Sequence, residues 1–295
     1  MLNYILYYLI IIPISLLPYP LLYLFSDFLY LFIYYILGYR KKVVISNLKN
    51  SFPKKSLEEL KLIEKKFYSH FCDIIVETLK TFTISEKDIR KRCNYKNAEM
   101  LNEYYKKGQS VIGVTAHYGN WEWGALSMGI FLKPKTMGIF QKLKSNFWDK
   151  KLRASRSKFG LTLIPTDKVK PWLNENKNNV VFPGFVGDQS PFKANRCHWM
   201  TFLNQETPVF LGAEKYAREF NWPLIYAIVR KVKRGYYEIE FKLVTENPRE
   251  ETPSSITEKH VKILEESIIE NPEYWLWTHR RWKYSKPDDY KPYQG

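Results

Sequence analysis

The stretch SVIGVTAHYGNWEWGALSMGIF, residues 110–131, contains the pattern that decides the fold. Its first six residues, 110–115, form a short apolar run that is typical of a buried strand. Gly119 permits a tight turn, and Asn120 is a residue type that commonly caps the start of a helix. Residues 121–131 then have the pattern of a helix. The stretch therefore predicts a strand, a turn and a helix, which is the repeating unit of α/β proteins.

The same alternation of short apolar runs and helical runs continues through the chain. Strands are expected at 135–140, 161–165, 179–184, 222–230 and 236–244. Helices are expected at 56–83, 145–158, 167–176, 208–220 and 255–269, and two of them begin with the capping-box spacing, at Ser56–Glu59 and Ser255–Glu258. We therefore expect an α/β fold with a central mixed, partly parallel sheet flanked by helices, and no linker that divides it.

Residues 1–39 form an apolar block that contains no Lys or Arg and a single acid, Asp27. About 20 apolar residues are enough for a helix to span a bilayer. Three prolines, at positions 13, 18 and 20, interrupt the block and argue against one straight helix. A basic cluster at 40–42 follows, which places the rest of the chain on the cytoplasmic side of a membrane.

Two arrangements of this block remain open. Residues 2–17 and 21–37 either form two short helices in a hairpin that dips into one leaflet, or one helix spans while the other packs on the domain. A third alternative is a buried helical hairpin in the core of a soluble protein. In either membrane arrangement, we expect a membrane-associated apolar segment over 1–39 and a cytoplasmic-side domain over 40–295.

The chain is strongly basic, with 46 Lys and Arg against 30 Asp and Glu and a formal net charge of +16. Such a balance predicts an anionic partner: nucleic acid, an acidic membrane surface, a phosphorylated substrate or an acidic protein. Eleven basic and two acidic residues lie between 133 and 170. Within that segment, Arg153 and Arg156 lie one helical turn apart, a spacing that suits a phosphate clamp. The three cysteines lack CxxC spacing, which argues against a disulfide framework and a structural zinc site.

His117 follows the strand at 110–115 and therefore lies where open α/β sheets bind ligands, at the carboxyl end of a strand. Glu122 falls in the first turn of the next helix, and the intervening turn allows the two side chains to meet. A carboxylate bonded to one imidazole nitrogen raises the basicity of the other, so the pair can deprotonate a hydroxyl. The alternative is that Glu122 is there because acids favour the first turn of a helix.

Two further segments carry candidate residues. The loop at 183–191 contains Asp188 and Gln189, with Lys193 and Arg196 close behind. An acid in such a basic loop suits the fixing of an arginine or the orienting of a substrate, although it is also a common turn residue. Nearer the C-terminus, three tryptophans interleave with basic residues, a pattern typical of an interfacial anchor or of stacking on nucleic acid: Trp275, Trp277 and Trp282.

Taken together, these segments resemble the bacterial lipid A acyltransferases of the late, lauroyl or myristoyl type, within the lysophospholipid acyltransferase superfamily. The resemblance covers nearly the whole chain and includes the apolar N-terminal block. It continues, in order, through RKKVVISNLKNSFP (40–53), AHYGNWEWG (116–124), RSKFG (156–160), GDQSP (187–191), FLGAEKYARE (210–219) and PEYWLWTHRRWK (272–283).

The resemblance implies that His117 is the general base and that Glu122 is the acid that orients it. Residues expected to contact substrate are Arg156, Asp188, Asn120, Arg153 and Gln189. The donor implied is an acyl carrier protein bearing a fatty acyl thioester, with acyl-CoA as the alternative. No metal, no other cofactor and no nucleic acid is expected.

The implied reaction is acyl transfer to a hydroxyl of a lipid A precursor or related glycolipid, at the bacterial inner membrane with the acyltransferase domain on its cytoplasmic side. A lysophospholipid or an amino lipid is the alternative acceptor. An alternative of another class is a non-enzymatic protein of the membrane surface that binds anionic lipid or nucleic acid. That alternative predicts salt-sensitive binding that does not depend on His117.

Overall fold

A seven-stranded sheet forms the centre of the computed structural model, which describes residues 2–191 and 197–293. The strand order is β1-β9-β8-β2-β5-β3-β4, and every neighbouring pair is parallel except β8 and β9. The strands are β1 (Cys93–Tyr95), β2 (Ile112–Thr115), β3 (Lys135–Phe140), β4 (Thr162–Pro165), β5 (Val181–Val186), β8 (Leu224–Lys233) and β9 (Tyr236–Thr245). The predicted α/β fold with a mixed, largely parallel sheet is confirmed.

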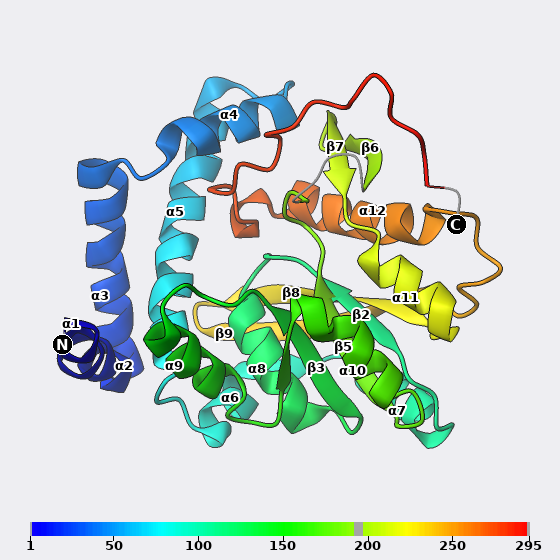
Figure 1. Ribbon diagram of the computed structural model, residues 1–295. Helices are drawn as coiled ribbons and strands as arrows, with labels where there is room; N and C mark the ends of the chain where they lie inside the picture. Colours follow the sequence, from blue (N-terminus) through cyan, green and yellow to red (C-terminus); the bar gives the residue numbers. More distant parts are fainter. Residues whose placement is uncertain (1, 192–196, 294–295) are drawn as a thin grey trace.

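Helices cover both faces of this sheet, as Figure 1 shows for α12 on one side and α6 and α8 on the other. Side chains of β8 alternate between the two resulting cores: Leu224 and Tyr226 join one cluster, Ile225 and Val229 the other. The helices are α4 (Lys41–Ser51), α5 (Leu57–Lys80), α6 (Glu86–Arg92), α7 (Glu99–Lys106), α8 (Trp121–Phe131), α9 (Asn146–Arg156), α10 (Val169–Glu175), α11 (Gly212–Phe220) and α12 (Ser255–Glu270).

Most expected elements occur where the sequence placed them, and the differences are local. The capping box at Ser56 and Glu59 is confirmed, with both of its hydrogen bonds present. The second capping box is wrong, because the residue before α12 is Ser254, which makes no side-chain cap. The sequence also gave no indication of α4, of β1, or of a separate hairpin formed by β6 (His198–Phe202) and β7 (Gln205–Val209).

The apolar N-terminal block forms two helical stretches. The first runs over Leu2–Leu16 through α1 (Leu2–Ile5), η1 (Leu6–Ile11) and α2 (Ile12–Leu16), and the second over Tyr19–Leu37 through α3 (Tyr19–Leu31) and η2 (Phe32–Leu37). The chain is extended at Leu17 and Pro18, so the block breaks there, whereas Pro13 and Pro20 lie within the first turns of α2 and α3. Among the described residues, the second stretch is the one helix long and apolar enough to cross a membrane.

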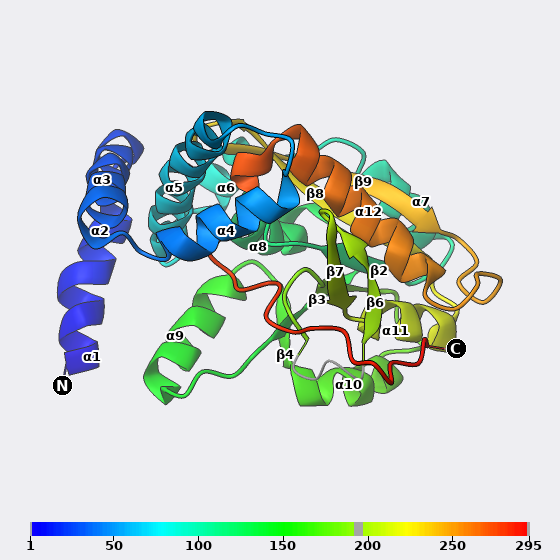
Figure 2. The ribbon, with the colours of Figure 1, turned by 90° about the horizontal axis from the view of Figure 1, so that it is seen from above.

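The packing of these helices excludes some of the arrangements that the sequence left open for residues 1–39. Figure 1 shows α1 end-on and α3 from the side, whereas Figure 2 shows the reverse, so the two stretches cross instead of forming a hairpin. Only 17% of the most apolar part of Tyr19–Leu37 is buried. A hairpin buried in a soluble core is therefore wrong. The two helices expected for the membrane-dipping arrangement are present, but they cross and do not form the expected hairpin.

Candidate active site

The turn after β2 holds His117 at the carboxyl end of the sheet. The C-terminal segment pairs with this turn, since the Leu276 N–H donates to the His117 carbonyl at 3.2 Å and the Gly119 N–H donates to the Tyr274 carbonyl at 3.0 Å. Gly119 has φ +61°, and a Cβ there would lie 2.1 Å from the Val229 carbonyl oxygen. Only glycine fits, so the turn is fixed by backbone contacts on both sides.

Asp188 is the carboxylate that holds the His117 imidazole. Its Oδ1 lies 2.8 Å from His117 Nδ1, and its Oδ2 accepts the His117 backbone N–H at 3.1 Å. The indole N–H of Trp275 also donates to Oδ2, at 2.9 Å. Because Nδ1 donates to Asp188, the lone pair of the neutral imidazole is on Nε2. The expectation that Glu122 orients His117 is therefore wrong, and Asp188 has that place.

Burial and the neighbouring charge shift the pKa values of His117 and Asp188 in opposite directions. Burial lowers the pKa of His117, but the nearby carboxylate of Asp188 outweighs it, and the net pKa lies above that of an ordinary histidine. Burial raises the pKa of Asp188, but the imidazole and the three donors outweigh it, and the net pKa is lowered. Both shifts favour the ion pair in which Asp188 is ionised and His117 is protonated.

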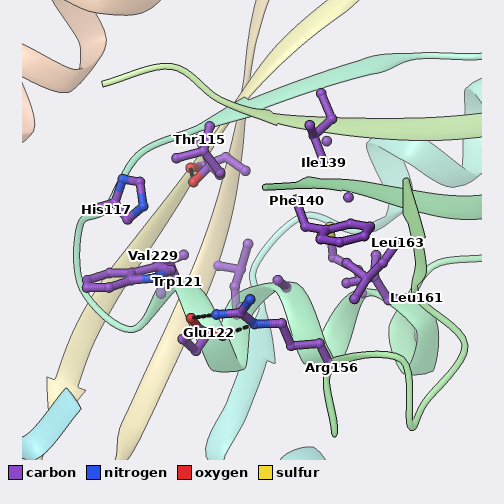
Figure 3. A pocket seen from close by; sticks show the side chains of 18 of the residues that line it. Thr115, His117, Trp121, Glu122, Ile139, Phe140, Arg156, Leu161, Leu163 and Val229 are labelled. Atoms are coloured by element: carbon purple, nitrogen blue, oxygen red, sulfur yellow. Dashed lines mark hydrogen bonds and ion pairs between the residues drawn. The ribbon is translucent and has the colours of Figure 1, made fainter. Parts of the chain in front are cut away.

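Glu122 pairs with Arg156 instead. Arg156, at the end of α9, donates from Nε to Glu122 Oε2 at 2.8 Å and from Nη2 to Oε1, the two parallel bonds drawn in Figure 3. Burial lowers the pKa of Arg156 and the Glu122 carboxylate more than restores it. This bidentate geometry fixes the plane of the guanidinium. Glu122 thus orients the cation that the sequence had predicted as a substrate contact.

Asn120 is a structural residue, and its predicted contact with substrate is wrong. Its side chain is fully buried; Oδ1 accepts the Trp123 N–H at 2.8 Å, which confirms the helix cap, and Nδ2 donates to Glu77 at 2.6 Å. Glu77 also accepts the hydroxyls of Tyr23 and Tyr237, at 2.7 and 2.6 Å. Burial raises the pKa of Glu77 to about 7. Sequence reasoning missed Glu77, because it lies within a long helix whose pattern indicated only packing.

A cavity of about 330 Å³ adjoins His117. Polar residues line one part of it, namely Thr115, His117, Glu122 and Arg156, and the remainder is mostly apolar. In Figure 3, His117 and Trp121 lie on one side of the cavity, and Phe140, Leu161 and Leu163 lie on the opposite side. Small residues leave room along the wall, at Gly124, Ala125, Gly138 and Gly184. The arrangement suits a flexible apolar chain whose reactive end lies beside an imidazole.

Comparison with known proteins agrees with this geometry. The sequence profile described as bacterial lipid A biosynthesis acyltransferase matches residues 1–284. The chain belongs to that family. A search among curated proteins found no match.

Membership of the lipid A biosynthesis acyltransferase family makes this protein an acyltransferase, with an acyl donor and a lipid acceptor as substrates. It therefore sets aside the non-enzymatic alternative. The family is membrane-associated, and the apolar N-terminal helix is present in the structure.

Of the other residues predicted to contact substrate in this lipid A acyltransferase, Gln189 lies beside His117 and Arg153 does not line the cavity. The Gln189 amide nitrogen lies 3.3 Å from His117 Nε2 and 3.5 Å from Nδ1, so it is close to the ring but not directed at one lone pair. Arg153 donates to Asp149 at 2.7 Å and Arg156 to Glu122, so the two arginines pair with different acids, and only Arg156 lines the cavity. Lys193 and Arg196 lie outside the described residues.

The C-terminal tryptophans are core residues of the acyltransferase fold. Trp275 and Trp277 are 2% and 0% exposed, so their predicted role in anchoring at a surface or stacking on nucleic acid is wrong. Trp275 contributes instead by holding Asp188.

A second hollow, of about 490 Å³, reaches the catalytic turn from the side of α5. Trp121 lines both this hollow and the first cavity. The other residues of the second hollow include Tyr39, Arg40, Phe71, Ile74, Gln189, Thr278 and His279. Trp121, whose ring centre lies 5.1 Å from that of His117, therefore lies between the two hollows.

Proposed function

We propose that this protein transfers a fatty acyl group from an acyl carrier thioester to a hydroxyl of a lipid A precursor or related glycolipid. The reaction takes place at the bacterial inner membrane, with the catalytic domain on the cytoplasmic side. The observation that carries the proposal is the His117–Asp188 pair beside an apolar cavity, with 2.8 Å between Nδ1 and Oδ1. An imidazole held in this way presents Nε2 as a base to a hydroxyl.

His117 Nε2 takes the proton of the acceptor hydroxyl as its oxygen attacks the carbonyl carbon of the thioester. A carbon–oxygen bond forms, and the carbonyl oxygen becomes a tetrahedral oxyanion. The carbon–sulfur bond then breaks, and the departing thiolate takes the proton from the imidazolium. Asp188 stays ionised throughout and stabilises the imidazolium. Atoms and charge balance without a covalent intermediate on the enzyme.

Arg156 supplies positive charge for the oxyanion. Its Nε and Nη2 bond Glu122, which leaves Nη1 for a ligand in the cavity. The first turn of α8 lies beside it, and among the described residues the N–H groups of Trp121 and Glu122 have no acceptor. Preorganised donors of this kind stabilise a developing negative charge most in a site that excludes water.

The two hollows divide the substrates between them. The apolar cavity suits the acyl chain, because its far wall is built from residues such as Phe140 and Leu163. The second hollow suits the acceptor, because it opens toward Arg40 and the end of the apolar N-terminal helices. The net charge of +16 suits an acidic carrier protein as the donor, since complementary charge speeds encounter.

The test is incubation of the purified full-length protein with acyl carrier thioesters and a panel of lipid acceptors, followed by mass spectrometry. We expect acylation of a lipid A precursor, faster from the carrier protein than from acyl-CoA. The His117→Ala variant is expected to lose roughly 10²-fold or more in rate. Normal transfer by that variant would overturn the mechanism, and acylation of only lysophospholipids or amino lipids would overturn the acceptor.

A further inference from the structure

The helix over Tyr19–Leu37 has a polar side that is bonded to the catalytic domain. The Tyr23 hydroxyl donates to Glu77 at 2.7 Å, and the Ser26 hydroxyl donates to Asp73 at 2.9 Å. Both acceptors belong to α5, and Figure 1 shows α3 running alongside that helix. Ser26 is fully buried by this contact.

The same side continues toward the C-terminal end of the helix. One turn on, Asp27 accepts two bonds from Arg234, at 2.6 and 3.1 Å, and Arg234 also donates to Asp73. Near the end, the Tyr34 hydroxyl donates to Glu64 at 3.3 Å. Charged and hydrogen-bonded groups therefore accompany the helix from residue 23 to residue 34.

These contacts are incompatible with a helix that crosses the membrane. The stretch from Tyr23 to Tyr34 rises about 16 Å, more than half of the roughly 30 Å hydrocarbon core. A spanning helix would therefore carry Asp73 and Arg234 to hydrocarbon depth, where charged groups are costly. The other stretch, Leu2–Leu16, rises only about 22 Å and is too short to span.

The side of Tyr19–Leu37 that faces away from α5 is apolar and exposed, and Leu2–Leu16 also has an apolar, exposed side. We define the outer apolar face by eight exposed residues of the two stretches, which are 53–76% exposed: Leu2, Leu9, Leu16, Leu24, Phe28, Leu31, Tyr35 and Ile36. Figures 1 and 2 show both stretches on the same flank of the molecule. So many exposed apolar side chains on one flank mark a binding surface on a folded protein.

Lysines lie close to tyrosines of both helical stretches. Lys151 Nζ lies 3.2 Å from the Tyr8 hydroxyl, and Lys41 Nζ lies 3.8 Å from the centre of the Tyr34 ring. The segment before and within α9 packs on the first stretch through Phe147, which contacts the Tyr4 ring, and it adds three exposed lysines: Lys142, Lys144 and Lys150. An apolar surface flanked by lysines and tyrosines matches an anionic lipid leaflet in both chemistry and charge.

We infer that the N-terminal helices lie in the plane of one anionic leaflet and do not cross it. The outer apolar face enters the acyl region, and the α5 side stays at headgroup level or above it. The second hollow begins at Tyr39, directly after these helices. If the proposed function holds, an acceptor lipid in that leaflet reaches His117 without passing through water.

Depth measurement tests the orientation directly. Single cysteines placed at Leu21, Phe28 and Tyr35, which share one side of the helix at seven-residue spacing, carry a fluorophore in the full-length protein. The three native cysteines are buried, so the new thiols react first. In vesicles of phosphatidylethanolamine and phosphatidylglycerol, lipids brominated at different depths should quench all three labels at the same shallow depth. A label at Phe28 far deeper than the other two would establish a spanning helix and overturn the inference.

Variants test the surface itself. Leu24→Gln with Phe28→Gln should lower the vesicle partition coefficient at least about tenfold. The matched control is Tyr105→Gln, a residue of α7 that is 39% exposed; both views show α7 on the side of the molecule opposite this flank. Unchanged partition of the double variant would contradict the assignment. Loss of a dimer with vesicle binding intact would instead assign the face to a second copy of the chain.

Charge reversal tests the anionic lipid. Lys142→Glu with Lys144→Glu should weaken binding roughly tenfold or more to vesicles that contain phosphatidylglycerol, but little to neutral phosphatidylcholine. Lys106→Glu with Lys107→Glu, at the end of α7 away from the flank, serves as the control. Equal weakening in both pairs would show that only net charge matters. His117→Ala should lose acyl transfer but bind vesicles normally. Loss of vesicle binding and loss of acyl transfer therefore test the membrane inference and the catalytic proposal separately.

Discussion

His117 and Asp188 are 71 residues apart in the chain, and their side chains meet at 2.8 Å. The contact makes Asp188 the residue that sets the proton affinity of the imidazole. Trp275 donates to the other carboxylate oxygen, so three distant segments together position one imidazole.

Replacing Asp188 with Asn should change both the rate and its pH dependence. His117 must be neutral to accept a proton, and Asp188 holds its pKa above the ordinary value. Activity in the wild type should therefore rise with pH through a midpoint above about 6.5. In Asp188→Asn that midpoint should move to lower pH, and the plateau of kcat/KM should fall roughly 10²–10⁴-fold.

Asp149→Asn is a matched control, because Asp149 is a carboxylate of α9 that pairs with Arg153. Its pH profile should keep the wild-type midpoint. An unmoved midpoint in Asp188→Asn would show that the imidazole is not the titrating base.

Substitutions of Glu122 and Arg156 should lower kcat non-additively, because the two side chains act together. Arg156→Ala should lower kcat about 10²-fold if its guanidinium stabilises the oxyanion. Because Glu122 acts through Arg156, Glu122→Ala should cost no more, and the double variant should cost about as much as Arg156→Ala alone. Steady-state kinetics of the three variants checks this. Losses that multiply in the double variant would show that Glu122 has a separate role.

Filling the apolar cavity should change the preferred acyl length. Ala125 lines the cavity, and Ala125→Leu adds three carbon atoms to its wall. The longest acyl chain that the wild type accepts should then be disfavoured about tenfold or more relative to shorter ones. Competition between acyl donors of different length measures this ratio. Ala98→Leu, just before α7, is the control; an equal shift there would mean that the cavity does not hold the chain.

Glu77 should matter for folding more than for chemistry. Glu77→Ala leaves three buried donors, from Tyr23, Asn120 and Tyr237, without their acceptor. The free energy of unfolding should fall by about 3 kcal/mol or more, whereas Tyr237→Phe should cost only about 1 kcal/mol. Urea unfolding curves provide the comparison. Similar losses in the two variants would show that Glu77 is not the shared acceptor of this network.

Local rules made most of the fold predictable. The strand, turn and helix around Gly119 follow from apolar periodicity, a position that only glycine fits and a capping Asn120. The capping box at Ser56 and the break at Pro18 follow from equally local chemistry. The hairpin of β6 and β7 was not predictable in this way, because it packs through contacts with distant parts of the chain.

In the candidate site, too, some features follow from local sequence and others only from the tertiary structure. By itself, the sequence determined that His117 stands at the end of a buried strand and that two acids are available to it. Proximity in the chain favoured Glu122, but the start of α8 directs that carboxylate to Arg156. Only the tertiary structure shows that Asp188, and not Glu122, bonds the His117 imidazole.

The physical reason lies in the sheet. The strands β2 and β5 are adjacent and parallel, and Thr115 pairs with Val186 at their carboxyl ends. His117 and Asp188 each follow that pair by two residues, so strand register brings base and acid together. The N-terminal helices show the same division: the sequence determined their apolar character and their break, and only packing on α5 decided which side stays exposed.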